Sequence, residues 1–342
     1  MEKLPLGERP EPRTVGRGSF EAKAKTKREI IERFQDNLVS FTEEHIAELK
    51  AAERDKTDEQ KEGIKVANEI TNEILREFGL QEFDIPEQNV HFVSAEEWAK
   101  HPSVADVAMS TFPEKQLILA KGDYQPSARV SKALSLFHEM IHAKGHFSID
   151  VDSDVKHGPY RSGLTTHATY KKVEKSGNAV WFDGLNEAVV AQIEMDYGNR
   201  VLTSNPFLKD QVEYLSSNEV QKMKHDHAKK RGIDPSEIEW IGRDGDDIEV
   251  FYASYPGQRR VLNYVVDQIC ADGDFASRDD VMKLFFAAHF RDSLLPLGRI
   301  VEKSFGKGSF EFLGTMDRES DSGSVGRVLD FLTKRRREMK KT

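Results

Sequence analysis

The stretch SLFHEMIHAKGHF, Ser135–Phe147, places three histidines and a glutamate within a pattern that otherwise predicts an apolar helix. On an α-helix, His138 and His142 project from the same face one turn apart, so both imidazoles can reach one metal ion. Glu139 lies about 100° further round the helix, where it can contact a water held by that ion without ligating the ion. Burying these groups without partners would be costly. The HExxH pattern therefore predicts a zinc site on a buried helix.

Zinc in a hydrolase takes three protein ligands and keeps one position for water, so a third ligand must come from elsewhere in the chain. We expect the helix to span about 127–144 and to end at Gly145 in a left-handed conformation. The longer pattern HExxHxxGxxH would require a histidine at position 148, where the chain has Ser148. The remaining candidates for the third ligand are His146, Asp150, Asp152, His157, His167 and Glu187.

The segment LNEAVVA, residues 185–191, belongs to a second predicted helix that begins near Asp183. HExxH followed by an Asn-Glu-Ala tripeptide resembles the gluzincin zinc peptidases, the group that includes thermolysin. The resemblance covers roughly residues 88–205, and it implies that Glu187 is the third zinc ligand. It also implies that Glu139 is the general base for the attack of water on a peptide carbonyl.

Two positions depart from the family pattern. Thermolysin-like members orient a zinc-bound imidazole with an aspartate one turn after the ligand glutamate, and this chain has Ala191 there. The orienting group must then be another residue, such as Asp183 or Glu194. Lethal-factor-type members carry a tyrosine where this chain has Val180, which leaves the oxyanion donor unassigned.

The segment VAMSTF, residues 107–112, occupies the place of the gluzincin edge strand, which pairs with the substrate backbone. The resemblance implies an extended peptide or protein substrate that adds to this edge. An ordinary sheet edge is the alternative interpretation. We expect a surface or capping role for five other polar residues: Tyr160, Arg161, His225, His227 and Tyr255.

Composition limits the other classes of function. The formal net charge of −9 would repel phosphate backbones, so we expect no nucleic-acid partner. The single cysteine, Cys270, excludes an internal disulfide and a cysteine-based zinc cluster, and it fits a reducing compartment. No apolar run reaches the roughly 18 residues of a membrane span. We therefore expect a cytoplasmic protein with no membrane partner.

The predicted fold class is α+β, with a zincin-like core in which a small mixed sheet accompanies an active-site helix and a glutamate helix. We expect a mobile N-terminus over 1–19, a helical hairpin over 20–80, the catalytic core over 85–205 and a mainly helical subdomain over 206–342. The predicted function is zinc-dependent peptide hydrolysis. Two alternatives remain: a regulatory or interaction protein with an idle or structural zinc site, and a zinc hydrolase that acts on something other than peptides.

Overall fold

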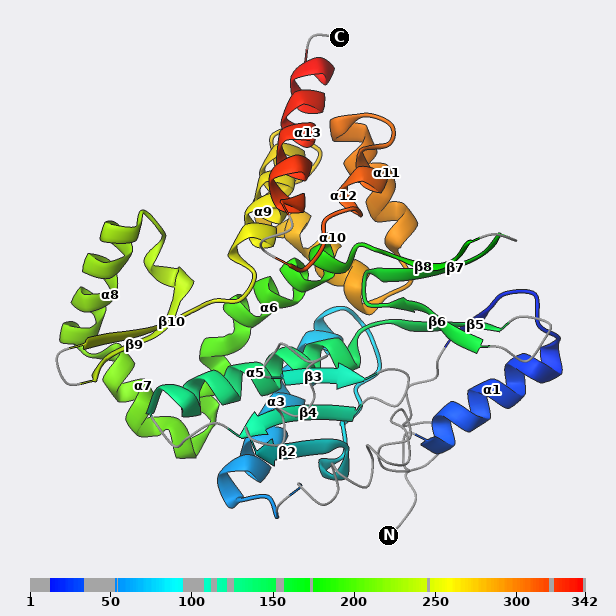
Figure 1. The fold of residues 1–342 in the computed structure, drawn as a ribbon. Coiled ribbons are helices and arrows are strands. Elements are labelled where there is room, and N and C mark those ends of the chain that lie inside the picture. The colour runs from blue at the N-terminus through cyan, green and yellow to red at the C-terminus, as the bar shows by residue number, and fades with distance from the viewer. Residues whose placement is uncertain are drawn as a thin grey trace. The chain divides into compact units, whose positions relative to one another are not determined.

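The structure is a computed structural model, and it describes residues 13–33, 53, 55–94, 108–111, 116–121, 126–151, 157–172, 175–244, 247–319 and 323–340. These residues form a mixed α+β fold, as the sequence predicts, and its strands belong to three sheets (Figure 1). Much of the first helix of the predicted hairpin, residues 34–52, lies outside the described residues. The sequence pattern Ser94-x-x-Glu97, which is typical of a helix capping box, extends outside them as well.

The helices are α1 (Phe20–Arg33), α3 (Asp58–Glu77), α5 (Pro126–Lys144), α6 (Asp183–Ser204), α7 (Lys209–Ser216), α8 (Asn218–Arg231), α9 (Pro256–Cys270), α10 (Arg278–Phe290), α11 (Leu294–Phe305), α12 (Ser309–Leu313) and α13 (Ser324–Met339), with short 3-10 turns η2 (Glu87–Asn89), η3 (Pro206–Leu208) and η4 (Pro235–Glu237). The strands are β1 (Arg13–Val15), β2 (Val90–Ser94), β3 (Ala108–Thr111), β4 (Gln116–Lys121), β5 (Phe147–Val151), β6 (His157–Ser162), β7 (Thr165–Lys172), β8 (Lys175–Trp181), β9 (Ile238–Asp244) and β10 (Asp247–Tyr252).

The described residues fall into two compact units. The first unit comprises the described parts of Glu29–Ala143 and Glu194–Ser254. The second unit comprises those of Glu11–Arg28, Lys144–Ile193 and Tyr255–Thr342. Helix α6 is continuous and contributes its first half to the second unit and its second half to the first.

The first unit contains a three-stranded sheet in the order β2-β4-β3, with β2 parallel and β3 antiparallel to β4. The alternating apolar residues of β2 pack with α3 and α5 in one core, to which Ile64, Val90, Leu117, Leu136 and Met140 contribute. Because α5 buries Leu136 and Met140 in this core, the rotation of the helix about its own axis is fixed. That rotation also sets the direction of the side chains between these two residues. Strand β3 forms an edge of the described sheet, where VAMSTF was expected.

Helix α3 begins at the pattern Thr57-x-x-Gln60, which is typical of a helix capping box. The side chain of Thr57 accepts a hydrogen bond from the backbone of Gln60, and the Gln60 side chain accepts one from the backbone of Thr57. This reciprocal capping box satisfies two backbone donors that the first turn of a helix leaves unpaired. Helix α5 ends at Lys144, close to the predicted boundary, but Gly145 does not adopt the expected left-handed conformation.

Two β features are missing from the sequence-based description. In the second unit, β1 pairs in parallel with β5 at the edge of the sheet β1-β5-β6-β7-β8, within the N-terminal segment for which we expected mobility. In the first unit, β9 and β10 form an antiparallel hairpin inside the segment expected to be mainly helical. The hairpin has a sequence signal, since the dipeptide Gly245-Asp246 stands between two runs of alternating apolar residues.

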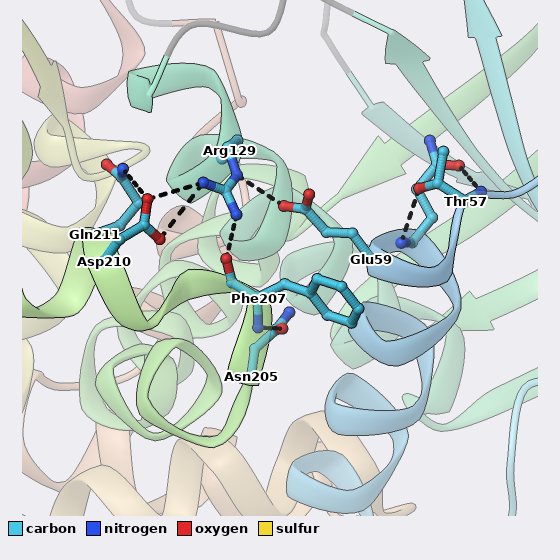
Figure 2. A network of polar contacts seen from close by, with 8 residues as sticks. Thr57, Glu59, Arg129, Asn205, Phe207, Asp210 and Gln211 are labelled. Atoms are coloured by element: carbon cyan, nitrogen blue, oxygen red, sulfur yellow. Dashed lines mark hydrogen bonds and ion pairs between the residues drawn. The ribbon is translucent and has the colours of Figure 1, made fainter.

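The start of α5 is held by a charged network around Arg129 (Figure 2). Arg129 Nε donates to Glu59 Oε1 of α3 at 2.9 Å, and Nη1 donates to Asp210 Oδ2 of α7 at 3.1 Å. Arg129 Nη2 also donates to the carbonyl oxygen of Phe207. One guanidinium therefore joins three segments of the first unit.

Candidate metal centre

Helix α5 buries all three polar residues of its HExxH pattern, and His138, Glu139 and His142 are only 8%, 8% and 7% exposed. The Nε2 atoms of the two histidines are 3.2 Å apart. Two nitrogen ligands of a tetrahedral zinc, each about 2.0–2.1 Å from the ion, lie about 3.3 Å from one another. The two imidazoles thus have the separation that a single ion requires.

The ring of His138 is oriented by Glu194 of α6. The distance between His138 Nδ1 and Glu194 Oε2 is 2.8 Å, and the Glu194 side chain is almost completely buried. Because a carboxylate accepts, the proton resides on Nδ1, and Nε2 keeps a lone pair for a metal. Asp183, the other expected candidate, lies 3.4 Å from Thr165 Oγ1 and pairs with Arg318. Glu194 is therefore the orienting partner of His138.

Glu187 precedes Glu194 by two turns of the same helix, so the two carboxylates share one helical face. His138, His142 and Glu187 form a buried group in which one ligand atom from each residue lies within 4.8 Å of the others. This group could hold a metal ion. Two imidazole nitrogens and a carboxylate are also a donor set that hydrolytic zinc sites use, so the residues fit that metal.

The other described candidates for the third ligand are not part of this group. His146, Asp150 and His167 lie outside it, and burial lowers the pKa of His167. Asp152 and the side chain of His157 fall outside the part of the chain that the structure describes.

The first turn of α6, which carries Glu187, is placed by a strained residue. Phe182 has a φ of 63°, and its N–H donates to the carbonyl of Gly314 at 2.7 Å. Its ring packs on Phe310 with centroids 4.6 Å apart. A non-glycine residue adopts positive φ only where its surroundings impose it. The local sequence gives no signal for this conformation, because asparagine, aspartate and glycine are the residues that favour it.

Arg161 corrects one of the sequence-based expectations. It is buried, and its side chain donates to the backbone carbonyls of Gly163, Ala288 and Arg291. Burial lowers its pKa to about 10. The predicted surface or capping role of Arg161 is wrong, and its contacts instead attach β6 to the end of α10.

The side-chain contacts of the two α8 histidines lie at the surface, as predicted. His225 Nδ1 lies 2.8 Å from the Gln221 carbonyl, and His227 Nε2 lies 2.7 Å from the Tyr252 hydroxyl. Both contacts are exposed.

No protein-family model, curated protein or solved structure matches this chain. Of the helices in the described residues, none combines the length and apolar character needed to cross a membrane. The case for a metal centre therefore depends on the geometry of the site itself.

Proposed function

We propose that the chain is a zinc-dependent metallopeptidase of the gluzincin type. The observation that carries this proposal is the buried His138–His142–Glu187 group, with Glu194 orienting His138. The proposal includes a zincin-like core built from the sheet β2-β4-β3 with helices α5 and α6. Support for that core comes from the antiparallel edge strand β3, which precedes α5 in the chain as the edge strand does in gluzincins.

The residues of the site have separate roles in this proposal. His138, His142 and Glu187 would hold the zinc ion, which would act as a Lewis acid, lowering the pKa of water toward about 7 and polarising the scissile carbonyl. Glu139 accepts the proton of the attacking water on a carboxylate oxygen and returns it to the leaving amine nitrogen. Glu194 keeps the proton on His138 Nδ1, so the imidazole retains its lone pair on Nε2.

The substrate class follows from the sheet edge. Strand β3 pairs with β4 on one side and has no second partner among the described strands. An extended peptide could add to this edge through backbone hydrogen bonds, which require no particular side chain. We therefore propose a peptide or unfolded protein segment as the substrate.

The test is cleavage of a denatured protein mixture, with zinc measured on the same sample. We expect about one zinc per chain, from one three-residue ligand set, and peptide-bond cleavage. Glu139→Gln should keep the zinc and the fold while lowering the rate by about 10²–10⁴-fold. Glu219→Gln, an exposed glutamate of α8, is the matched control and should cleave at the wild-type rate.

Each part of the proposal has its own contrary result. If a double variant with His138→Ala and His142→Ala kept its full zinc content, the proposed zinc site would be wrong. A zinc-loaded protein that cleaves no peptide bond would instead favour the regulatory alternative. Zinc loss in Glu139→Gln would mean that Glu139 is a ligand and not the base.

A further inference from the structure

The residue directly before Glu187 belongs to a buried network that the proposed reaction does not use. The Asn186 side-chain oxygen accepts a hydrogen bond from the backbone N–H of Leu164 at 2.8 Å and lies 3.0 Å from His289 Nδ1. The bond from Leu164 identifies this atom as the amide oxygen, because a backbone N–H can only donate. His289 Nδ1 therefore carries a proton and is the second donor.

His289, at the end of α10, also contacts the chain that leaves α5. Its carbonyl oxygen accepts from the backbone N–H of His146 at 2.9 Å, four residues after His142. The carbonyl of His146 in turn accepts from the N–H of Gly163 at 2.7 Å. The backbone and side-chain bonds thus form a closed ring, which joins the exit of α5, the β6–β7 turn, the start of α6 and the end of α10.

The ring leaves no space for a larger residue at its centre. Gly163 has a φ of +56°, and a Cβ there would lie 2.4 Å from Asn186 Oδ1 and 2.6 Å from His289 Nδ1. His289 itself has no exposed surface. Burying an imidazole completely costs folding free energy unless its polar atoms make hydrogen bonds. An apolar residue would avoid this cost if the position served packing alone.

We propose that His289 is a positioning residue of the metal centre, because its hydrogen bond to Asn186 sets the rotation of the first turns of α6 and hence the direction of the Glu187 carboxylate. The same residue anchors the chain that follows His142. The inference rests on the proposed ligation by Glu187. A group that orients a metal ligand raises the affinity for the metal without touching the ion. Without that group the ligand side chain can rotate, and its conformational freedom is lost when the metal binds.

The experiment measures zinc affinity by chelator competition and the visible absorption of the cobalt-substituted protein, which reports coordination geometry. His289→Leu should weaken zinc binding by about 10- to 100-fold and alter the cobalt spectrum. His289→Asn, whose amide N–H can replace the Nδ1 donor, should recover most of the affinity. Phe285→Leu is the matched control, because Phe285 is equally buried on α10 and should lower the melting temperature without changing either metal readout.

Asn186→Ala tests the same bond from the other helix and decides the matter if His289→Leu does not fold. Asn186→Ala should lose a similar amount of zinc affinity. The double variant with His289→Leu should bind zinc little worse than Asn186→Ala alone, since both changes remove the same bond between Asn186 and His289. Wild-type affinity and cobalt spectrum in Asn186→Ala or in folded His289→Leu would overturn the positioning role. Unchanged zinc affinity in His142→Ala would overturn the metal centre itself, so the two failures are distinguishable.

Discussion

Helix α5 carries ionisable side chains near its start and in its second half, and the two regions differ in burial. Near the start, the Arg129 side chain is 24% exposed, and its partners Glu59 and Asp210 are 33% and 62% exposed (Figure 2). In the second half, the side chains of His138 and Glu194 are only 10% and 5% exposed. Both regions belong to the first unit, and both connect α5 to neighbouring helices.

The difference in burial predicts a difference in function. Exposed ion pairs are screened by water and salt, and each contributes about 0–1 kcal/mol, so the Arg129 network can be altered at small cost. A buried histidine and carboxylate hold each other in one orientation, because neither has water as an alternative partner. Stability is the expected role of the first region, and metal binding the expected role of the second.

The largest effect should come from the proposed third ligand. Glu187→Ala removes a coordinating oxygen and the negative charge that offsets the cation, so zinc affinity should fall by more than the roughly 10- to 100-fold cost of losing an orienting partner. His146→Ala, Asp150→Ala and His157→Ala, measured by the same chelator competition, should change it little. If one of these three variants loses the metal and Glu187→Ala keeps it, the gluzincin interpretation is wrong even though a zinc site remains.

The next effect concerns the orienting partner. Glu194→Gln keeps the shape of the side chain but removes the charge that holds the proton on His138 Nδ1, so zinc affinity should drop by about 10- to 100-fold. Asp183→Asn, on the same helix but bonded to Thr165, is the matched control and should bind zinc normally. Equal zinc affinities in Glu194→Gln and Asp183→Asn would show that the buried carboxylate of Glu194 has no special role in metal binding.

At the start of α5, Arg129→Met should lower the free energy of unfolding by about 1 kcal/mol and leave zinc affinity unchanged. Chemical denaturation at low and high salt measures the effect, which should shrink as salt rises because the pairs are partly exposed. A zinc affinity that falls with Arg129→Met would mean that the two regions of α5 are coupled.

The smallest effect should be that of Asp210→Asn, which should lower the free energy of unfolding by about 0.5 kcal/mol at neutral pH. The hydrogen bond from Gln211, followed by the charge of Arg129, holds the pKa of Asp210 below its ordinary value of 3.8. A lowered folded-state pKa stabilises the protein above pH 3.8, and this contribution is lost as pH falls through the folded-state value. Denaturation curves of the two proteins should therefore converge below pH 3.8, and a constant difference would contradict the charge-based explanation.

Much of the fold around the site could be predicted because its signals are local. The apolar spacing around HEMIH predicted a helix over 127–144, and α5 spans Pro126–Lys144. The predicted helix near Asp183 is α6. Strand β1 could not be predicted in this way, because its three residues are ordered by pairing with β5, which lies more than 130 residues later in the chain.

The sequence by itself determined that His138, Glu139 and His142 are neighbours, because the helical repeat places residues four apart on one face whatever surrounds the helix. It could not choose between Asp183 and Glu194 as the partner of His138, since both lie on the same face of α6 as Glu187. Tertiary structure made that choice, because the partner is the carboxylate that packing brings within hydrogen-bond distance of α5. The bond between His289 and Asn186 was likewise decided by packing alone, since no local pattern relates two residues 103 positions apart.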